Sequence, residues 1–316
     1  MSAVSRERSG VTDLILHHYD FSNYAEKVRL ALGYKGLEWQ SVLIPPVAPK
    51  PDLAPLTGGY RRTPVLQIGS DIYCDTRLIL RELERRHPAP MLYPPQLAAH
   101  AHAIAYWAEN QLFRPISLFV SGSNPDVFPP SMQADRAKMR GLPPPDADTM
   151  RRAAERSAPL VRTQLPWIET MLSDGRDWIA GPATTIADFA IYHALWFITG
   201  RTSRLAHELD PYVLIAAWMA RMRAFGHGRS TPMPPAEALR IAEQTTPEPV
   251  RPSKPFAEDP PLGTMVRIRA DDYGKDPIEG ELIFVEAEEI AIRRHDPRVG
   301  EIVVHFPRLG YDVRRI

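Results

Sequence analysis

The order of the apolar patterns in residues 14–86 constrains this fold more than any other sequence feature. Short strand-like runs alternate with segments whose apolar residues recur at helical spacing. The order is strand, helix, strand, a loop rich in Pro and Gly, two strands and a helix, at 14–18, 24–33, 40–44, 45–60, 64–68, 71–74 and 76–86. Gly69-Ser70 is a hairpin turn dipeptide between the last two strands. This order predicts a small α/β domain over residues 13–88.

Residues 97–244 keep helical periodicity and predict an all-helical second domain. Pro115 is expected to close its first helix, and residues 121–147 read as a Pro-rich excursion. Pro159 and Pro166 are expected to kink a long helix. The helices are predicted at 98–113, 150–173, 185–199, 211–225 and 235–243.

The period changes from 3.6 to 2 after a Pro-rich linker at 245–261. Five short strands are predicted at 265–269, 278–285, 289–293, 301–306 and 311–315. So many short strands in a short segment suggest a small barrel or open roll. We therefore expect a third, β-rich module over residues 262–316.

Charge and composition exclude several classes of protein. Lys+Arg and Asp+Glu both number 38, so there is no electrostatic footprint for nucleic acid or an anionic membrane. No apolar run is long enough for a membrane span. Met1–Gly10 is polar and shows no signal peptide, and one cysteine, Cys74, fits a reducing compartment. These features predict a cytoplasmic protein.

Ser22 stands at the start of the first predicted helix. Free backbone N–H groups and the helix dipole favour an anion there, and a thiol brought to this position would ionise more easily. The alternative is that Ser22, or Asn23 with Glu26, only caps the helix.

Two further positions have chemical potential. Thr63-Pro64 opens a strand, and a proline there is often a cis turn that exposes the backbone of Thr63. Asp75-Thr76 opens the next helix, where a carboxylate ligand group suits Thr76 and the free amides, and an ammonium suits Asp75. The alternatives are an edge-strand proline and a simple N-cap.

The joint order of these motifs resembles the glutathione transferase family. The motifs are Ser22 before a helix running Lys27-Val28-Arg29-Leu30-Ala31-Leu32, then Thr63-Pro64-Val65-Leu66, then Asp75-Thr76. Thr184-Thr185-Ile186-Ala187-Asp188-Phe189-Ala190 is similar to the family's second-domain signature, with Thr185 as N-cap and Asp188 as its capping-box partner. The resemblance implies a thioredoxin-like first domain and an all-helical second domain, and it covers residues 13 to about 225.

The resemblance also implies site residues. Ser22 matches the hydroxyl that holds the glutathione thiolate in the serine-type classes. The backbone of Thr63, before Pro64, would hold the cysteinyl part of glutathione. Asp75 and Thr76 would hold the γ-glutamyl end. Arg62 falls where a basic residue sometimes meets the glycyl carboxylate.

The chain departs from the family pattern at several positions. Asn23 stands where proline is common, and Asp75 is one methylene shorter than the usual acid or amide. Tyr19 and Tyr24 flank Ser22, so either phenol is an alternative donor to the thiolate. Cys74 lies in a predicted strand and is expected to be a buried structural residue. No metal site is expected, because adjacent strand residues His17 and His18 face opposite sides.

The expected function is that of a glutathione-dependent transferase. Glutathione would be a co-substrate, and its thiolate would attack an apolar electrophile held by the helical domain, as in detoxification enzymes. Transfer, ether cleavage and isomerisation stay open, and a homodimer is expected from the family. The alternative is a non-catalytic binding or scaffold protein with the same fold. The β-rich module has no assigned role.

Overall fold

The structure, a computed structural model, describes residues 13–316. Its first part contains strands β1 (Ile15–His18), β2 (Glu38–Leu43), β3 (Val65–Ile68) and β4 (Asp71–Cys74), and helices α1 (Asn23–Tyr34), α2 (Ala54–Thr57) and α3 (Thr76–Arg86). β1 pairs parallel with β2 and antiparallel with β3, which pairs antiparallel with β4. The predicted order of elements is confirmed, and the loop rich in Pro and Gly contains one short helical turn, α2.

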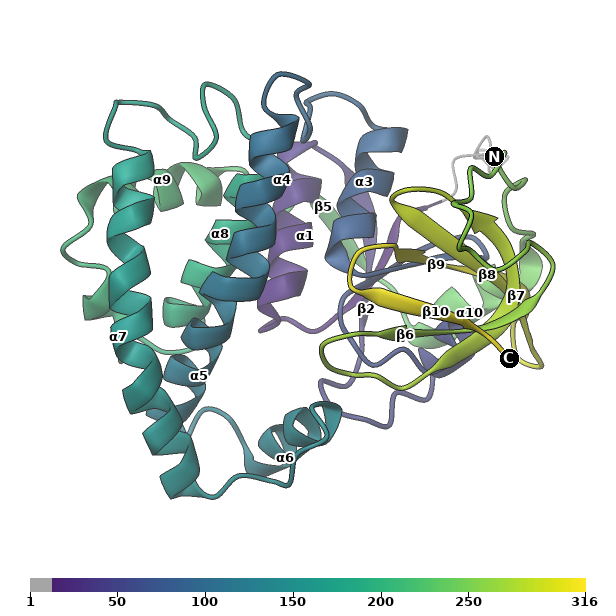
Figure 1. Cartoon of the computed structure of the whole chain (residues 1–316), viewed down its shortest axis with the longest axis horizontal. Helices are drawn as coiled ribbons and strands as arrows, with labels where there is room; N and C mark the ends of the chain where they lie inside the picture. Colours follow the sequence, from purple (N-terminus) through teal and green to yellow (C-terminus); the bar gives the residue numbers. More distant parts are fainter. Residues whose placement is uncertain (1–12) are drawn as a thin grey trace, which may run out of the picture.

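The second part is helical, as predicted. It contains α4 (Ala98–Trp107), the π-helical turn η1 (Ala108–Leu112), α5 (Phe113–Ser123), α6 (Pro130–Met139), α7 (Ala147–Met171), α8 (Ile186–Thr199), the 3-10 turn η2 (Ala206–Glu208) and α9 (Val213–Ala224). Helix α6 lies inside the segment expected to be irregular. In Figure 1 these helices stand on one side of the molecule, next to α1 and α3.

The prediction that Pro115 closes the helix from Ala98 is wrong. The helical path passes through η1 and continues as α5, with Pro115 in the first turn of α5. A proline there cannot bond to the carbonyl one turn earlier. The carbonyl of Gln111 instead accepts a hydrogen bond from the side-chain amide of Gln164 at 3.4 Å. The π-helical turn and this side-chain donor together let the path continue.

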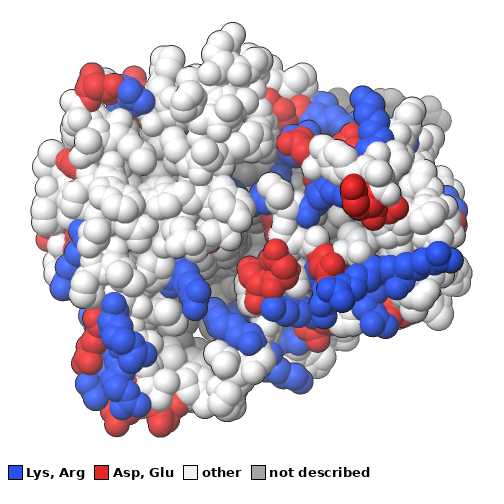
Figure 2. Space-filling model, viewed as in Figure 1, with Lys and Arg blue, Asp and Glu red and all other residues white. Residues whose placement is uncertain are grey.

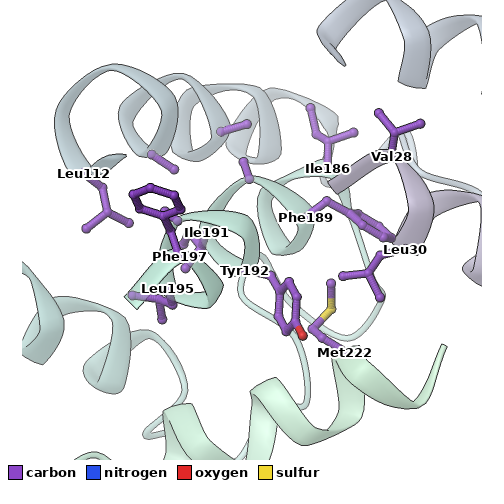
Figure 3. Packing of buried hydrophobic residues seen from close by; sticks show 14 of the residues in the cluster. Val28, Leu30, Leu112, Ile186, Phe189, Ile191, Tyr192, Leu195, Phe197 and Met222 are labelled. Atoms are coloured by element: carbon purple, nitrogen blue, oxygen red, sulfur yellow. The ribbon is translucent and has the colours of Figure 1, made fainter. Parts of the chain in front are cut away.

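Helix α8 forms the centre of the larger core. The predicted capping box is present: the side chain of Thr185 caps the first amides, and that of Asp188 accepts from the Thr185 N–H at 2.8 Å. Figure 3 shows Phe189 pointing toward Leu30 of α1 and Tyr192 beside Met222 of α9. One continuous core therefore fixes the helical part against the α1–α3 face of the sheet.

All five predicted C-terminal strands are present: β6 (Met265–Ala270), β7 (Ile278–Val285), β8 (Glu289–Asp296), β9 (Gly300–Pro307) and β10 (Tyr311–Arg315). They do not form the separate small barrel or roll that we predicted. They extend the first sheet, because β9 pairs parallel with β4, from Asp71 opposite Val303 to Tyr73 opposite His305. The full order is β10-β6-β7-β8-β9-β4-β3-β1-β2-β5. The pairing satisfies the edge of β4, which an isolated first domain would leave open.

The other edge of the sheet is covered by residues between the second and third parts. Strand β5 (Arg229–Pro232) pairs parallel with β2, and α10 (Pro235–Gln244) follows it. Ala238 and Leu239 of α10 belong to the same core as Leu56 of α2 and Phe306 of β9. Residues 229–244 thus contact the sheet, although we predicted them within the helical domain. The division into units at 13–88, 97–244 and 262–316 stays a prediction.

Within residues 13–316, no helix is both long and apolar enough to cross a membrane. The segment Met1–Gly10, which we predicted to contain no signal peptide, lies outside the described residues.

Candidate functional site

Ser22 caps helix α1. Its Oγ accepts a hydrogen bond from the N–H of Ala25 at 3.1 Å, and the residue is only 4% exposed. The same residue lines a cavity of about 570 Å³ between the loops that follow β1 and precede β3 and helices α5–α7. Both readings of Ser22 therefore fit: it is an N-cap, and it stands beside a cavity in which a ligand thiol could meet the helix N-terminus.

Thr63 and Pro64 lie at the start of β3, and the peptide bond between them is cis, as predicted. The Thr63 hydroxyl accepts from the ammonium of Lys50 at 2.7 Å. Burial, together with nearby Arg136, lowers the pKa of Lys50 to about 7, although Asp135 opposes the shift. The sequence analysis missed Lys50, because its position in a Pro-rich loop gives no pattern that links it to Thr63.

Asp75 and Thr76 open helix α3. Asp75 has a φ of 75°, unusual for a non-glycine residue, and its Oδ1 caps the helix by accepting from the Arg77 N–H at 3.0 Å. A backbone in this region costs about 1–3 kcal/mol and often marks a functional position. The Thr76 hydroxyl accepts from the ammonium of Lys27 at 3.1 Å.

A cluster of buried charged side chains lies next to Thr76. Lys27 is ion-paired with Glu109 of η1, and Arg77 contacts the other oxygen of Glu109 at 3.4 Å. Burial raises the pKa of Glu109, but Lys27 and Arg77 outweigh it and hold that pKa below its usual value. π-Helical turns frequently occur at functional sites. Only tertiary packing brings Glu109 here, so no local sequence signal could have found it.

The C-terminal strands reach the same site. The Tyr311 hydroxyl donates to Asp75 Oδ2 at 3.2 Å and lies 2.8 Å from the hydroxyl of Tyr60. Arg62 donates to the carbonyl of Tyr273 at 3.1 Å and is ion-paired with Asp272. The module without an assigned role therefore supplies a wall of the candidate site.

The predicted site residues line two adjacent cavities. A smaller one of about 220 Å³ is lined by Pro64, Asp75 and Thr76 and by the C-terminal residues 271–273 and 309–311. Ser22 lines only the larger one. The two share four lining residues: Tyr24, Arg62, Thr63 and Tyr273. The six predicted residues thus lie around one pair of adjoining cavities.

Tyr19 and Tyr24, the two alternative donors to the thiolate, also line these cavities. Tyr19 lines the larger cavity, and its hydroxyl accepts from Arg136 at 3.0 Å. Burial raises the pKa of Tyr24 well above its usual value, so this phenol stays protonated and can donate. The geometry leaves Ser22, Tyr19 and Tyr24 as candidate donors.

Other candidate residues lie apart from the cavities. Cys74 is buried, and burial raises the pKa of its thiol well above the usual value. His17 bonds to Gln67 and His18 to Ser41, each within the sheet. Within residues 13–316 no three His, Cys, Asp or Glu side chains are grouped to hold a metal ion.

Comparison with known proteins decides the family. Residues 16–91 match the family described as glutathione S-transferase, N-terminal domain, and residues 120–228 match a domain of unknown function. A crystal structure of a GST-like protein from Pseudomonas syringae is 39% identical, with a TM-score of 0.80 over 97% of this chain and 100% of that one. The chain belongs to the glutathione transferase family.

Two other proteins that are similar to this chain have names that point to different roles. FtsZ-localized protein A from Caulobacter vibrioides is 26% identical over 180 residues, which cover 55% of this chain and 72% of the relative. A glutathione S-transferase from Methylobacterium radiotolerans, solved with glutathione sulfonate, is 22% identical, with a TM-score of 0.51 over 70% of this chain and 98% of that one. That second likeness carries the fold alone. The GST fold of the first two parts is therefore established, and catalysis is a separate question.

Proposed function

We propose that the protein is a glutathione-dependent transferase acting on an apolar electrophile. The observation that carries the proposal is the pair of adjoining cavities. Ser22 at the N-terminus of α1 lines the larger one, which has an extensive apolar wall, and Asp75 and Thr76 at the N-terminus of α3 line the smaller one. A glutathione molecule whose γ-glutamyl end met Asp75 and Thr76 would present its thiol near Thr63 and Ser22.

Ser22 and the N-terminus of α1 are placed to stabilise a bound thiolate. Lowering a thiol pKa by two units requires about 3 kcal/mol. A charge-assisted hydrogen bond from a hydroxyl supplies about 1.5–3 kcal/mol, and the N-terminus of α1 adds about 0.3–1 kcal/mol. Together these two contributions span the required free energy, so the proposal needs no strong base. Transfer, addition, ether cleavage and isomerisation all begin with this thiolate, and product analysis distinguishes them.

Calorimetric titration with reduced glutathione tests the proposal. We expect saturable binding at millimolar concentration or tighter, and its loss in Asp75→Ala. Asp174→Ala removes an exposed aspartate in the turn after α7 and serves as the matched control. Absence of binding to the parent protein, or equal binding by Asp75→Ala, would contradict the proposal. Turnover of a panel of electrophiles would then establish catalysis.

A second candidate function is a non-catalytic scaffold. The specific observation is that Tyr311 already bonds Asp75 Oδ2, while Asp272 and Tyr273 hold Arg62. The smaller cavity, at about 220 Å³, also falls below the usual range for ligand pockets of about 300–1,000 Å³. The similarity to FtsZ-localized protein A suggests FtsZ as the partner. Saturable co-sedimentation with FtsZ polymers, together with no turnover, would favour this function.

The proposal also covers the oligomeric state of the protein and its location in the cell. We propose a cytoplasmic homodimer with a role in detoxification, as is usual for the family, and a division of the chain into three structural units at 13–88, 97–244 and 262–316, of which the first and the third share one sheet. Light scattering of the purified chain measures the assembly, and limited proteolysis tests whether residues 262–316 separate from the rest.

A further inference from the structure

The larger cavity combines an apolar wall with a cluster of arginines. Its apolar wall includes Phe21, Phe113, Phe128 and Phe197. Five arginines line the same cavity: Arg61, Arg62, Arg136, Arg140 and Arg201. A ligand without polar groups would cover those guanidinium N–H donors that have no acceptor within the protein, which is costly. The lining therefore suits a ligand that has both an apolar body and a hydrogen-bond acceptor.

Three of the five arginines already have carboxylate partners. Arg61 and Arg136 share Asp135, each at 2.6 Å. Arg62 is ion-paired with Asp272. These pairs neutralise most of the charge on this side of the cavity, so the remaining two arginines decide its preference.

Arg201 follows helix α8 and has no carboxylate within ion-pair distance among residues 13–316. Its guanidinium lies 4.1 Å from the ring centroid of Phe21 and 4.6 Å from that of Phe128. One nitrogen donates to the Val127 carbonyl at 2.9 Å, which leaves several of its five donors for a ligand. Stacking between two rings orients the planar group in advance, so that little conformational entropy is lost on binding.

Arg140, directly after α6, likewise has no carboxylate partner in the described part of the chain. It donates to the carbonyl of Arg136 at 3.1 Å and lies 5.5 Å from the ring centroid of Tyr273. Among the described lining residues, Asp146 is the single carboxylate, and its Oδ1 already caps α7 through the N–H of Thr149. Figure 2 shows Lys and Arg side chains along the hollow between the helices and the strands.

We infer that the larger cavity takes an aromatic ligand that carries one acidic group, which Arg201 and Arg140 recognise. The phenylalanines hold the ring, and the acidic group, a carboxylate or a sulfonate, accepts from the two guanidinium groups. The inference rests on the proposed function in treating this ligand as the electrophile, and it narrows the largely apolar substrate to one with an apolar ring and a single acidic group. A site that pairs a charge rejects a neutral analogue strongly, because its own donors are then left unpaired.

The test is a pair of calorimetric titrations without glutathione, using naphthalene carboxylate and the neutral naphthalene carboxamide. We expect the carboxylate to bind at least about tenfold more tightly, as charge-assisted hydrogen bonds predict. Naphthalene sulfonate serves as a third probe and distinguishes a general preference for acids from one for carboxylates. Because glutathione is absent, failure of the proposed transferase function does not affect this result.

Arg201→Gln and Arg140→Gln identify the residues. Each variant should weaken carboxylate binding several-fold or more and leave carboxamide binding within about twofold, because an arginine hydrogen bond to a charged group is stronger than one to a neutral group. Arg156→Gln removes an exposed arginine of α7 that does not line the cavity, and controls for the change in net charge. Equal binding of carboxylate and carboxamide to the parent protein would overturn the inference. So would an equal loss of carboxylate binding in Arg156→Gln.

Discussion

His305 joins the C-terminal strands to the first sheet by a buried ion-pair network, and we predict that its removal changes the pH dependence of stability. Its Nδ1 lies 2.7 Å from Glu289 of β8 and its Nε2 lies 3.1 Å from Asp71 of β4. Its ring stacks on Tyr73, with centroids 4.3 Å apart. Burial lowers the pKa of His305, but the bonds to Asp71 and Glu289 outweigh it, so that the pKa is raised above 6.5.

The sign of the effect follows from proton linkage. Between the unfolded pKa near 6.5 and the raised folded pKa, the folded protein holds a proton that the unfolded chain has lost. The contribution of His305 to the free energy of unfolding is therefore complete below pH 6.5 and falls as the pH rises. Its slope is at most about 1.4 kcal/mol per pH unit within that window.

His305→Gln keeps a hydrogen-bonding side chain and removes the charge. Breaking a buried ion pair costs about 3–5 kcal/mol. We expect about 3 kcal/mol here, at the low end, because Arg251 still pairs with Glu289 and the Glu248 N–H still bonds Asp71.

Urea unfolding at several pH values between 6.5 and 9 measures both quantities. The difference in the free energy of unfolding between parent and His305→Gln should be greatest at the acidic end and shrink with rising pH. His100→Gln, in helix α4, is the matched control. A difference that stays constant over this range would refute the proposed protonation of His305.

Three further predictions concern the candidate site. Ser22→Ala should raise the pKa of bound glutathione by about one unit or more, since one charge-assisted hydrogen bond is lost; ultraviolet absorbance of the thiolate measures it, and an unchanged value would point to Tyr19 or Tyr24. Tyr311→Phe should tighten glutathione binding about two- to tenfold by calorimetry, because Asp75 loses a competing donor; weaker binding would mean that the hydroxyl positions Asp75. Lys50→Met should abolish a rise in the free energy of unfolding between pH 7 and 10. The pKa of Lys50 is about 7 in the folded protein and 10.5 in the unfolded chain, so the unfolded chain binds the extra proton in this range. Urea unfolding of both proteins measures the effect, and a parent protein that gains no stability relative to the variant as the pH rises would contradict this pKa.

The sequence predicts those parts of the fold that depend on local signals. The hairpin at Gly69-Ser70, the start of α3 at Thr76 and the capping box of Thr185 with Asp188 are all where turn and capping chemistry placed them. The continuation of the helix past Pro115 was not predictable, because the compensating donor, Gln164, lies on another helix.

The candidate site shows the same limit. Ser22, Thr63, Asp75 and Thr76 could be chosen from the sequence because each stands at the start of a helix or strand. Tyr311 could not, since its contact with Asp75 depends on how distant strands pair. Alternating polarity predicts strands but not their neighbours, and for that reason the extension of the first sheet by β9 was mistaken for a separate barrel.

The parallel pairing of β4 with β9 also bears on how the chain is made. Residue 71 leaves the ribosome long before residue 303, its partner in the sheet. Until β9 has been synthesised, β4 presents an uncovered edge that can pair with another nascent chain. Closure of so long a loop is also slow. Translation that stops before β9 should therefore yield aggregates rather than a folded first domain, and chaperones would be needed most during this interval.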